Sequence, residues 1–273
     1  MLENFFKLSD NGTDLKTEVV AGITTFMTMA YILAVNPSIM AAAGMDQGAV
    51  FTATALSALI GTLLMAVFAN YPFALAPGMG LNAYFAYTVV LGMGYSWQVA
   101  LTAVFVEGLI FIVLSLTNVR EAIFNAIPKN LKAAVSVGIG LFIAFIGLQN
   151  AKIVIGGSTL LQLFSVENYN AVNNVQASFQ NAGITVLLAV IGIIITGILV
   201  IQNIKGNILW GILITWVLGI VCQFTGLYVP DPKLGFYGLL PDFSSGLSIP
   251  SLAPIFGKLD FGSIFSLNFI VVI

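Results

Sequence analysis

The amino-acid sequence predicts an all-α polytopic membrane protein, on the evidence of its composition and of repeated long apolar runs. Hydrophobic residues make up 59% of the 273 residues and charged residues only 7%, whereas soluble domains carry about 25% charged residues. The mean hydropathy is +1.04. Seven apolar runs have the length of about 20 residues that an α-helix needs to cross a bilayer.

The runs and the segments between them divide the chain. The predicted spans are Val19–Met40, Ala49–Ala69, Phe73–Leu91, Val99–Leu116, Ala133–Gln149, Gly183–Ile201 and Ile208–Phe224. We expect a cytoplasmic N-terminus (1–18), five spans within 19–149, an external loop (150–182), two further spans within 183–224, an external Pro/Gly-rich loop (225–261) and a truncated start of an eighth span (262–273). The Asn- and Gln-rich first loop is expected to be mobile. The second loop ends in SLAPIFGKLDF, which we expect to form a short interfacial helix.

Lysine and arginine residues predict the orientation. The N-terminus and the connections after the second, fourth and sixth runs carry six of them, whereas the connections on the other side carry three, Lys152, Lys233 and Lys258. Because positive charge accumulates on the cytoplasmic side, we expect a multi-pass plasma-membrane protein with a cytoplasmic N-terminus.

The third run has the length of a span but a centre that disfavours a helix. Pro77 lacks a backbone donor, and Gly78 and Gly80 add conformational freedom. Asn82 is a good N-cap for a half-helix over Ala83–Leu91. Such a broken span indicates a transporter's substrate site, and the alternative is a Pro/Gly kink that only packs closely against a neighbour.

Polar residues in the first run allow two interpretations. Thr24, Thr28 and Tyr31 share one helical face. They either line a polar cavity or bond back to their own helix and to its neighbours. Asn36-Pro37 is interpreted as a kink or as the outer limit of the helix.

Glu107 is the one carboxylate well inside an apolar run. An acid at membrane depth is costly unless it is protonated or paired, which makes it a functional candidate. We expect it to be protonated and hydrogen-bonded to backbone released by the broken span. Its role is then either supporting or direct proton coupling.

Small residues recur at helical spacing in the last three runs, where they predict close helix packing. The fifth run carries Ser136, Gly140, Ala144 and Gly147, and the sixth and seventh carry Gly192, Thr196, Gly211 and Thr215.

The composition also excludes several classes. The chain has no His and a single cysteine, Cys222, so we expect no histidine metal site and no disulfide within the chain. Its net charge of -2 gives no basic patch for a nucleic acid. Clustered catalytic groups are lacking, so an enzyme is not expected.

Three segments together resemble the AzgA-like purine permeases of the nucleobase–cation symporter and nucleobase–ascorbate transporter group. These segments read DLKTEVVAGITTFMTMAYILAVNP, FALAPGMGLNAYFAYTVV and NVREAIFNAIPKNLKAAVSVGIGLFIAFIGLQNA. The resemblance implies proton-coupled uptake of adenine, guanine or hypoxanthine, with the proton as coupling ion and no other cofactor. It also implies two inverted seven-span repeats, divided into core-type and gate-type spans. The third span is then half extended strand and half helix, and this chain is the first repeat plus a stub.

The resemblance assigns substrate-binding residues by position. The family's third-span asparagine falls on Asn82, with Gly80, Ala83 and Tyr84 beside it, and a first-span residue falls near Thr28–Tyr31. The carboxylates on the family's eighth and tenth spans would lie beyond Ile273. The expected partners are a purine base and the lipid bilayer, with a homodimer as an open alternative.

Two other functions remain open from the sequence. The first is an anion transporter or channel of the same fold, since a half-helix N-terminus attracts anions. The second is one half of a split transporter.

Overall fold

The computed structural model describes residues 5–117, 119–157, 160–240 and 248–262. Within them, six helical segments are long and apolar enough to cross a membrane. They are Leu15–Ala42, Gln47–Ala69, Trp97–Leu116, Lys129–Asn150, Phe179–Ile201 and Asn207–Phe224. Six of the seven predicted runs are therefore confirmed as helices, with ends within about four residues of those expected. The exception is the third run.

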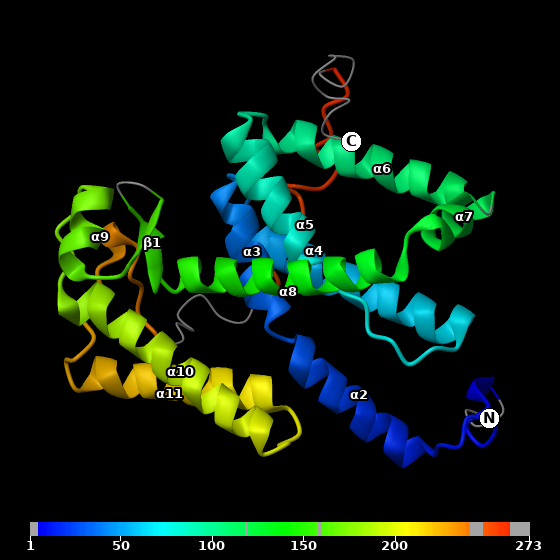
Figure 1. Cartoon of the computed structure of the whole chain (residues 1–273), viewed down its shortest axis with the longest axis horizontal. Coiled ribbons are helices and arrows are strands. Elements are labelled where there is room, and N and C mark those ends of the chain that lie inside the picture. Colours follow the sequence, from blue (N-terminus) through cyan, green and yellow to red (C-terminus); the bar gives the residue numbers. More distant parts are fainter. Residues whose placement is uncertain (1–4, 118, 158–159, 241–247, 263–273) are drawn as a thin grey trace. The chain divides into compact units, whose positions relative to one another are not determined.

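Figure 1 shows the order of the elements along the chain by colour and labels the α-helices and β1; in the text, η denotes a π-helix or, for η4, a 3-10 helix. The elements are α2 (Leu15–Met29), α3 (Ile32–Ala42), α4 (Gln47–Leu64), η1 (Met65–Ala69), α5 (Met79–Ala83), η2 (Tyr84–Gly92), α6 (Trp97–Leu116), α7 (Val119–Ala126), α8 (Lys129–Asn150), β1 (Val154–Gly156), β2 (Leu161–Leu163), α9 (Val166–Asn173), η3 (Phe179–Gly183), α10 (Ile184–Ile201), α11 (Asn207–Phe224) and η4 (Pro232–Leu234).

The chain forms two compact units. One consists of Met1–Ala30 with Ala144–Ser248, and the other of Tyr31–Ile143 with Ile249–Ile273. We call them the α10–α11 unit and the α3–α6 unit. The division of the spans into core-type and gate-type stays a prediction.

Side-chain caps explain where several helices begin. The backbone N–H of Ala49 donates to Asp46 at 2.7 Å at the start of α4, and Thr17 N–H donates to Asp14 at 2.9 Å at the start of α2. Each cap satisfies a backbone donor that has no partner inside its helix. The hydrogen bonds from Thr17 lower the pKa of Asp14, because they stabilise its charged form.

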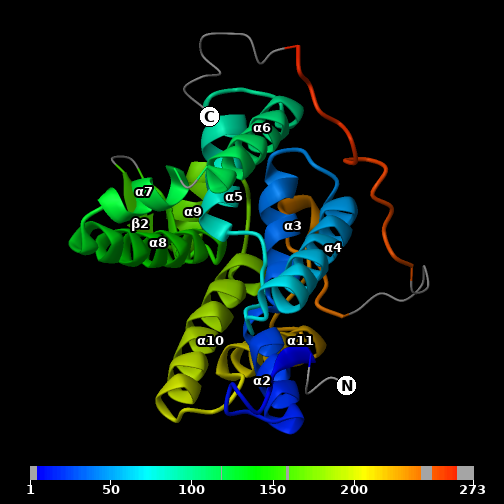
Figure 2. The same ribbon diagram turned by 90° about the vertical axis from the view of Figure 1, so that its right-hand side faces the viewer.

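The core of the α3–α6 unit is built from α3, α4, η2 and α6, the connection between α3 and α4, and one residue near the end of the described chain. Figure 2 shows α3 and α4 side by side. The buried apolar residues are Ile39, Met40, Ala43, Met45, Ala49, Val50, Phe85, Ala86, Val89, Ala100 and Ile255. A hydrogen bond also connects α4 to the segment around Pro250, because Thr52 Oγ1 donates to the carbonyl of Pro250 at 2.8 Å. This packing places the third run directly against α3.

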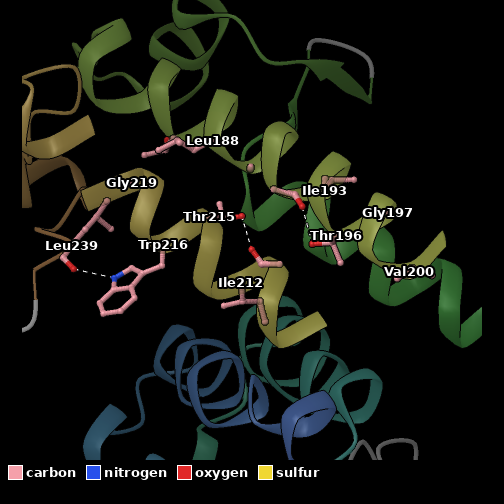
Figure 3. A pocket seen from close by; sticks show the side chains of 14 residues that line it. Leu188, Ile193, Thr196, Gly197, Val200, Ile212, Thr215, Trp216, Gly219 and Leu239 are labelled. Carbon is pink, nitrogen blue, oxygen red and sulfur yellow. Dashed lines mark hydrogen bonds between the residues drawn. The ribbon is translucent and has the colours of Figure 1, made fainter. Parts of the chain in front are cut away.

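In the α10–α11 unit the two long helices pack through reciprocal small residues. Thr215 of α11 lies against Gly192 of α10, and Thr196 of α10 lies against Gly211 of α11. Each threonine also donates its hydroxyl to the carbonyl of the glycine on its own helix, at 2.7 Å (Figure 3). The close packing predicted for the sixth and seventh runs is therefore confirmed. The same residues line an open, mostly apolar groove of about 680 Å³.

The expected mobile loop after α8 is instead folded, so that prediction was wrong. It contains the antiparallel pair β1–β2 and the helix α9. Its asparagines are used as caps and clamps: Asn170 exchanges two hydrogen bonds with the backbone of Ala177, and Asn181 completes a capping box with Ser178. A composition that resembles a disordered linker therefore satisfies local backbone groups here.

The interfacial helix expected over SLAPIFGKLDF does not form. Residues 253–257 make a turn in which the N–H groups of Ile255 and Phe256 donate to Leu252 O and that of Lys258 donates to Ile255 O, but this turn does not become a helix. Pro254 lacks a donor and Gly257 has a φ of +66°, which together end the turn. The expected start of an eighth span lies outside the described residues except for Gly262.

The glycines on the small-residue face of the fifth run pack closely against none of the described residues. A Cβ atom placed on Gly140 or Gly147 of α8 would meet nothing within 4 Å, and none of the described residues of α8 is buried. The close packing expected there is therefore not found within this part of the chain.

Candidate functional site in the broken third span

The third run is interrupted, as predicted, but at different residues. The helix of the second run ends at Asn70, which has a left-handed backbone (φ 50°, ψ 41°). Residues 70–78 form no regular element, and helical structure resumes at Met79 and continues to Gly92. The helical half is therefore Met79–Gly92 rather than Ala83–Leu91. Gly78 is the N-cap, and Asn82 lies inside α5, so the expected N-cap role of Asn82 was wrong.

The glycines of the break do not adopt backbone conformations that only glycine allows. Gly78 has φ -77° and ψ 116°, an extended conformation open to most residues, and Gly80 lies in the helix α5. A Cβ atom on Gly80 would lie 3.9 Å from Phe142, which is ordinary contact. The break depends instead on the left-handed Asn70 and on Pro72 and Pro77, whose nitrogens cannot donate.

Thr62 of α4 supports the irregular half of the span. Its Oγ1 accepts from the backbone N–H of Leu75 at 3.0 Å and lies 3.4 Å from the Leu75 carbonyl oxygen. At membrane depth, backbone groups outside a helix need such partners, because lipid offers none.

A line of polar side chains joins the helical half of the span to α3 and α4. Asn82 Nδ2 donates to Asn36 Oδ1 at 2.6 Å, and Asn36 Nδ2 donates to Thr54 Oγ1 at 2.7 Å. Thr54 Oγ1 in turn donates to the carbonyl of Val50 at 2.7 Å. Asn36 is 5% exposed and Thr54 is 2% exposed, while Asn82 is half-buried. The line therefore runs from the α4 backbone to a side chain that remains accessible.

The sequence interpretation missed Asn36 and Thr54. Asn36-Pro37 was interpreted as a kink or a helix end, yet α3 continues through Pro37 to Ala42. The available signal was an amide within the apolar stretch Ile32–Met40, since a buried amide needs partners. Nothing in the local pattern identified the partner.

The other predicted site residues lie at different depths. Ala83 is buried inside α5, with 1% of its surface exposed. The first helical hydrogen bond of α5 is donated by the N–H of Asn82 to the carbonyl of Gly78. The backbone N–H groups that precede this bond therefore belong to Met79, Gly80 and Leu81 and not to Ala83. Tyr84 is 41% exposed.

In the first run, Thr28 donates to Thr25 O at 2.7 Å and Thr24 donates to Val20 O at 2.8 Å. These bonds agree with the interpretation in which the threonines bond back to their own helix. Tyr31 lies between α2 and α3, at the start of the α3–α6 unit, and is half-buried.

Glu107 lies on an exposed face of α6. Among the described residues no hydrogen bond to it is found, so the expected bond to the broken span is not present there. Groups of three or more potential metal ligands are also absent from the described part of the chain.

Comparison with known proteins identifies the family. Residues 16–233 match the permease family. This chain belongs to the permease family. It is 43% identical over 283 aligned residues to the guanine/hypoxanthine permease PbuG of Bacillus subtilis, covering all of this chain and 58% of PbuG. It is 39% identical to the adenine permease AdeP of Escherichia coli, covering 91% of this chain and 54% of AdeP.

The resemblance to nucleobase permeases seen in the sequence is thereby confirmed, and with its apolar helices the permease is a multi-pass membrane protein. The guanine/hypoxanthine permease PbuO of Bacillus subtilis is a further relative, at 41% identity over 92% of this chain. The chain spans about half the length of the curated relatives that it matches.

Proposed function

We propose that this permease carries purine nucleobases and binds the base beside Asn82. The observation that carries the proposal is the hydrogen-bonded amide of Asn82, held by Asn36 at the start of the helical half of a broken span. Relatives named for guanine, hypoxanthine and adenine transport support the substrate class.

The chemistry of the site suits a flat heterocycle. The edge of a purine offers both donors and acceptors, which an amide and backbone N–H groups can match. The exposed ring of Tyr84, two residues after Asn82, is proposed as a stacking face on the basis of the family resemblance. Gly80, Thr28 and Tyr31 are proposed as further contacts on the basis of the family resemblance alone.

The proposal extends to transport as a whole. We expect proton-coupled uptake with the N-terminus in the cytoplasm, as the lysine and arginine distribution indicates. The seven crossings would form one repeat of a two-repeat transporter. The share of the relatives that this chain covers, 54–58% in the most extensive matches, supports this arrangement.

Uptake of radiolabelled hypoxanthine into cells without purine permeases of their own tests the proposal. The chain is expressed alone and as a chimera followed by the part of PbuG that it does not cover. We expect uptake in at least one form, loss of uptake in Asn82→Ala and retained uptake in Leu91→Ala, whose exposed side chain lies on the same helical half. Absence of uptake in both forms, or full uptake in Asn82→Ala, would contradict the proposal.

Two additions test the finer parts. A protonophore should abolish accumulation if protons drive it. Excess adenine should compete with hypoxanthine, whereas sulfate should not; competition by sulfate alone would favour an anion transporter.

A further inference from the structure

The hydrogen bonds behind Asn82 determine which way its amide faces. The hydroxyl of Thr54 has one hydrogen atom, and that hydrogen is donated to the Val50 carbonyl. Toward Asn36 the hydroxyl can therefore only accept. Asn36 must turn its Nδ2 toward Thr54, and its Oδ1 then faces Asn82.

The donor and acceptor atoms of the Asn82 amide follow in the same way. Because Asn36 presents an oxygen, Asn82 must donate through its Nδ2, at the observed distance of 2.6 Å. The Oδ1 atom of Asn82 accepts from none of the described residues, and its side chain is only half-buried. A carbonyl oxygen is thus left to accept from a bound molecule.

We propose that Asn36, supported by Thr54, is a specificity-determining positioning residue that commits Asn82 Oδ1 to accept an N–H group of the substrate. This inference rests on the proposed function, in that the bound molecule is a purine base. Adenine, guanine and hypoxanthine share an imidazole N–H, so one fixed acceptor serves all three. An analogue methylated at the nitrogen that faces Asn82 replaces that donor with an apolar group and leaves the oxygen unsatisfied.

The size of the effect follows from the cost of an unmet hydrogen bond. A bound base covers the Asn82 oxygen, and leaving an acceptor that has been removed from water without a donor costs about 1–3 kcal/mol, or roughly 5- to 150-fold in affinity. If the Asn82 amide could rotate, Nδ2 could face the ligand instead, and much of this discrimination would be lost.

Competition binding with hypoxanthine and its 1-, 7- and 9-methyl derivatives measures this discrimination, in whichever form of the permease transports hypoxanthine. For the unchanged protein we expect the 7- and 9-methyl derivatives, which lack the imidazole N–H, to bind at least about tenfold more weakly than hypoxanthine, whereas the 1-methyl derivative keeps this donor. In Asn36→Leu and Thr54→Val the penalty of the 7- and 9-methyl groups should fall by at least about fivefold, while Thr54→Ser, which keeps the hydroxyl, should retain it.

Thr52→Val is the matched control. Thr52 is a buried threonine on the same helix and also donates one hydrogen bond, but to Pro250, outside the line. It should lower stability without changing the methyl penalty.

Two results would overturn the inference while leaving the proposed function intact. One is an unchanged methyl penalty in Asn36→Leu with hypoxanthine still bound, and the other is an equal loss of discrimination in Thr52→Val. Failure of the unchanged protein to bind any purine would instead count against the proposed function itself.

Discussion

The hydroxyl oxygen of Thr215 lies 2.5 Å from the position that a Cβ atom on Gly192 would occupy. No side chain larger than hydrogen fits there unless Thr215 moves. The reciprocal contact of Thr196 with Gly211 makes α10 and α11 a matched pair (Figure 3).

Gly192→Ala should therefore destabilise the α10–α11 pair. Overpacking of this kind costs about 1–3 kcal/mol, and the expected result is a lower midpoint of thermal unfolding in detergent micelles. Gly197→Ala on the same helix is the control, because a Cβ atom there would meet nothing within 4 Å. If the two variants unfold alike, the close contact does not govern packing.

Gly80→Ala separates a binding role of Gly80 from a structural one. The added methyl group would be 3.9 Å from Phe142 and the backbone is helical, so thermal stability should be unchanged or slightly higher. If the base lies against Gly80, the KM for hypoxanthine uptake should rise. An unchanged KM would remove Gly80 from the site.

Thr62→Val should loosen the irregular half of the third span. The Leu75 N–H would lose its acceptor, and its hydrogen exchange should accelerate about fivefold or more, as expected for a lost hydrogen bond worth about 1 kcal/mol or more. Thr62→Ser keeps the oxygen and should exchange as the unchanged protein does. Equal protection in the valine variant would show that another group satisfies Leu75.

Asn170→Leu should open the loop between α9 and η3. Both polar atoms of the Asn170 amide bond to Ala177, at 2.9 and 2.7 Å, so the substitution removes two hydrogen bonds at once. Limited proteolysis should then cut near Val175. Asn173→Leu, which removes one exposed hydrogen bond to Tyr169 O, is the comparison and should stay resistant. Equal cleavage of both variants would show that the two hydrogen bonds between Asn170 and Ala177 do not hold the loop closed.

Lys152 should make stability depend on pH. Burial lowers its pKa below the ordinary value of 10.5, and its Nζ lies 4.6 Å from the centre of the Phe236 ring. Between the lowered pKa and 10.5 the unfolded chain binds more protons than the folded one, so the free energy of unfolding rises as the pH is raised.

Thermal unfolding measured from about pH 8 to 10 should show this rise, and Lys152→Met should flatten it. Burial raises the pKa of Tyr169 and Tyr228, which gives the opposite slope only above their ordinary value of 10.0. The same slope in Lys152→Met and in the unchanged protein would exclude Lys152 as the cause.

The positions of the long helices could be predicted because each depends on local composition. An apolar run of about 20 residues has one favourable state in a membrane, a helix that satisfies its own backbone, so α6 and α11 begin and end near the expected residues. Likewise Pro77 indicated a break in the third run, since a missing donor is a local property, whereas the contribution of Pro72 was not predicted.

Local sequence was therefore enough to predict a multi-pass helical protein with one broken crossing, its resemblance to the nucleobase permeases and Asn82 as a candidate binding residue. The packing of distant segments, in contrast, was needed to show that Asn82 contacts Asn36, 46 residues earlier in the chain, and that Asn36 in turn contacts Thr54. The structure was also needed to show that the Asn-rich loop is folded and that the side chain of Thr215 packs against Gly192. The hydrogen-bond partner of a buried polar group, and the side chain that packs against a small residue, come from segments far away in the sequence. The local pattern of residues does not carry that information.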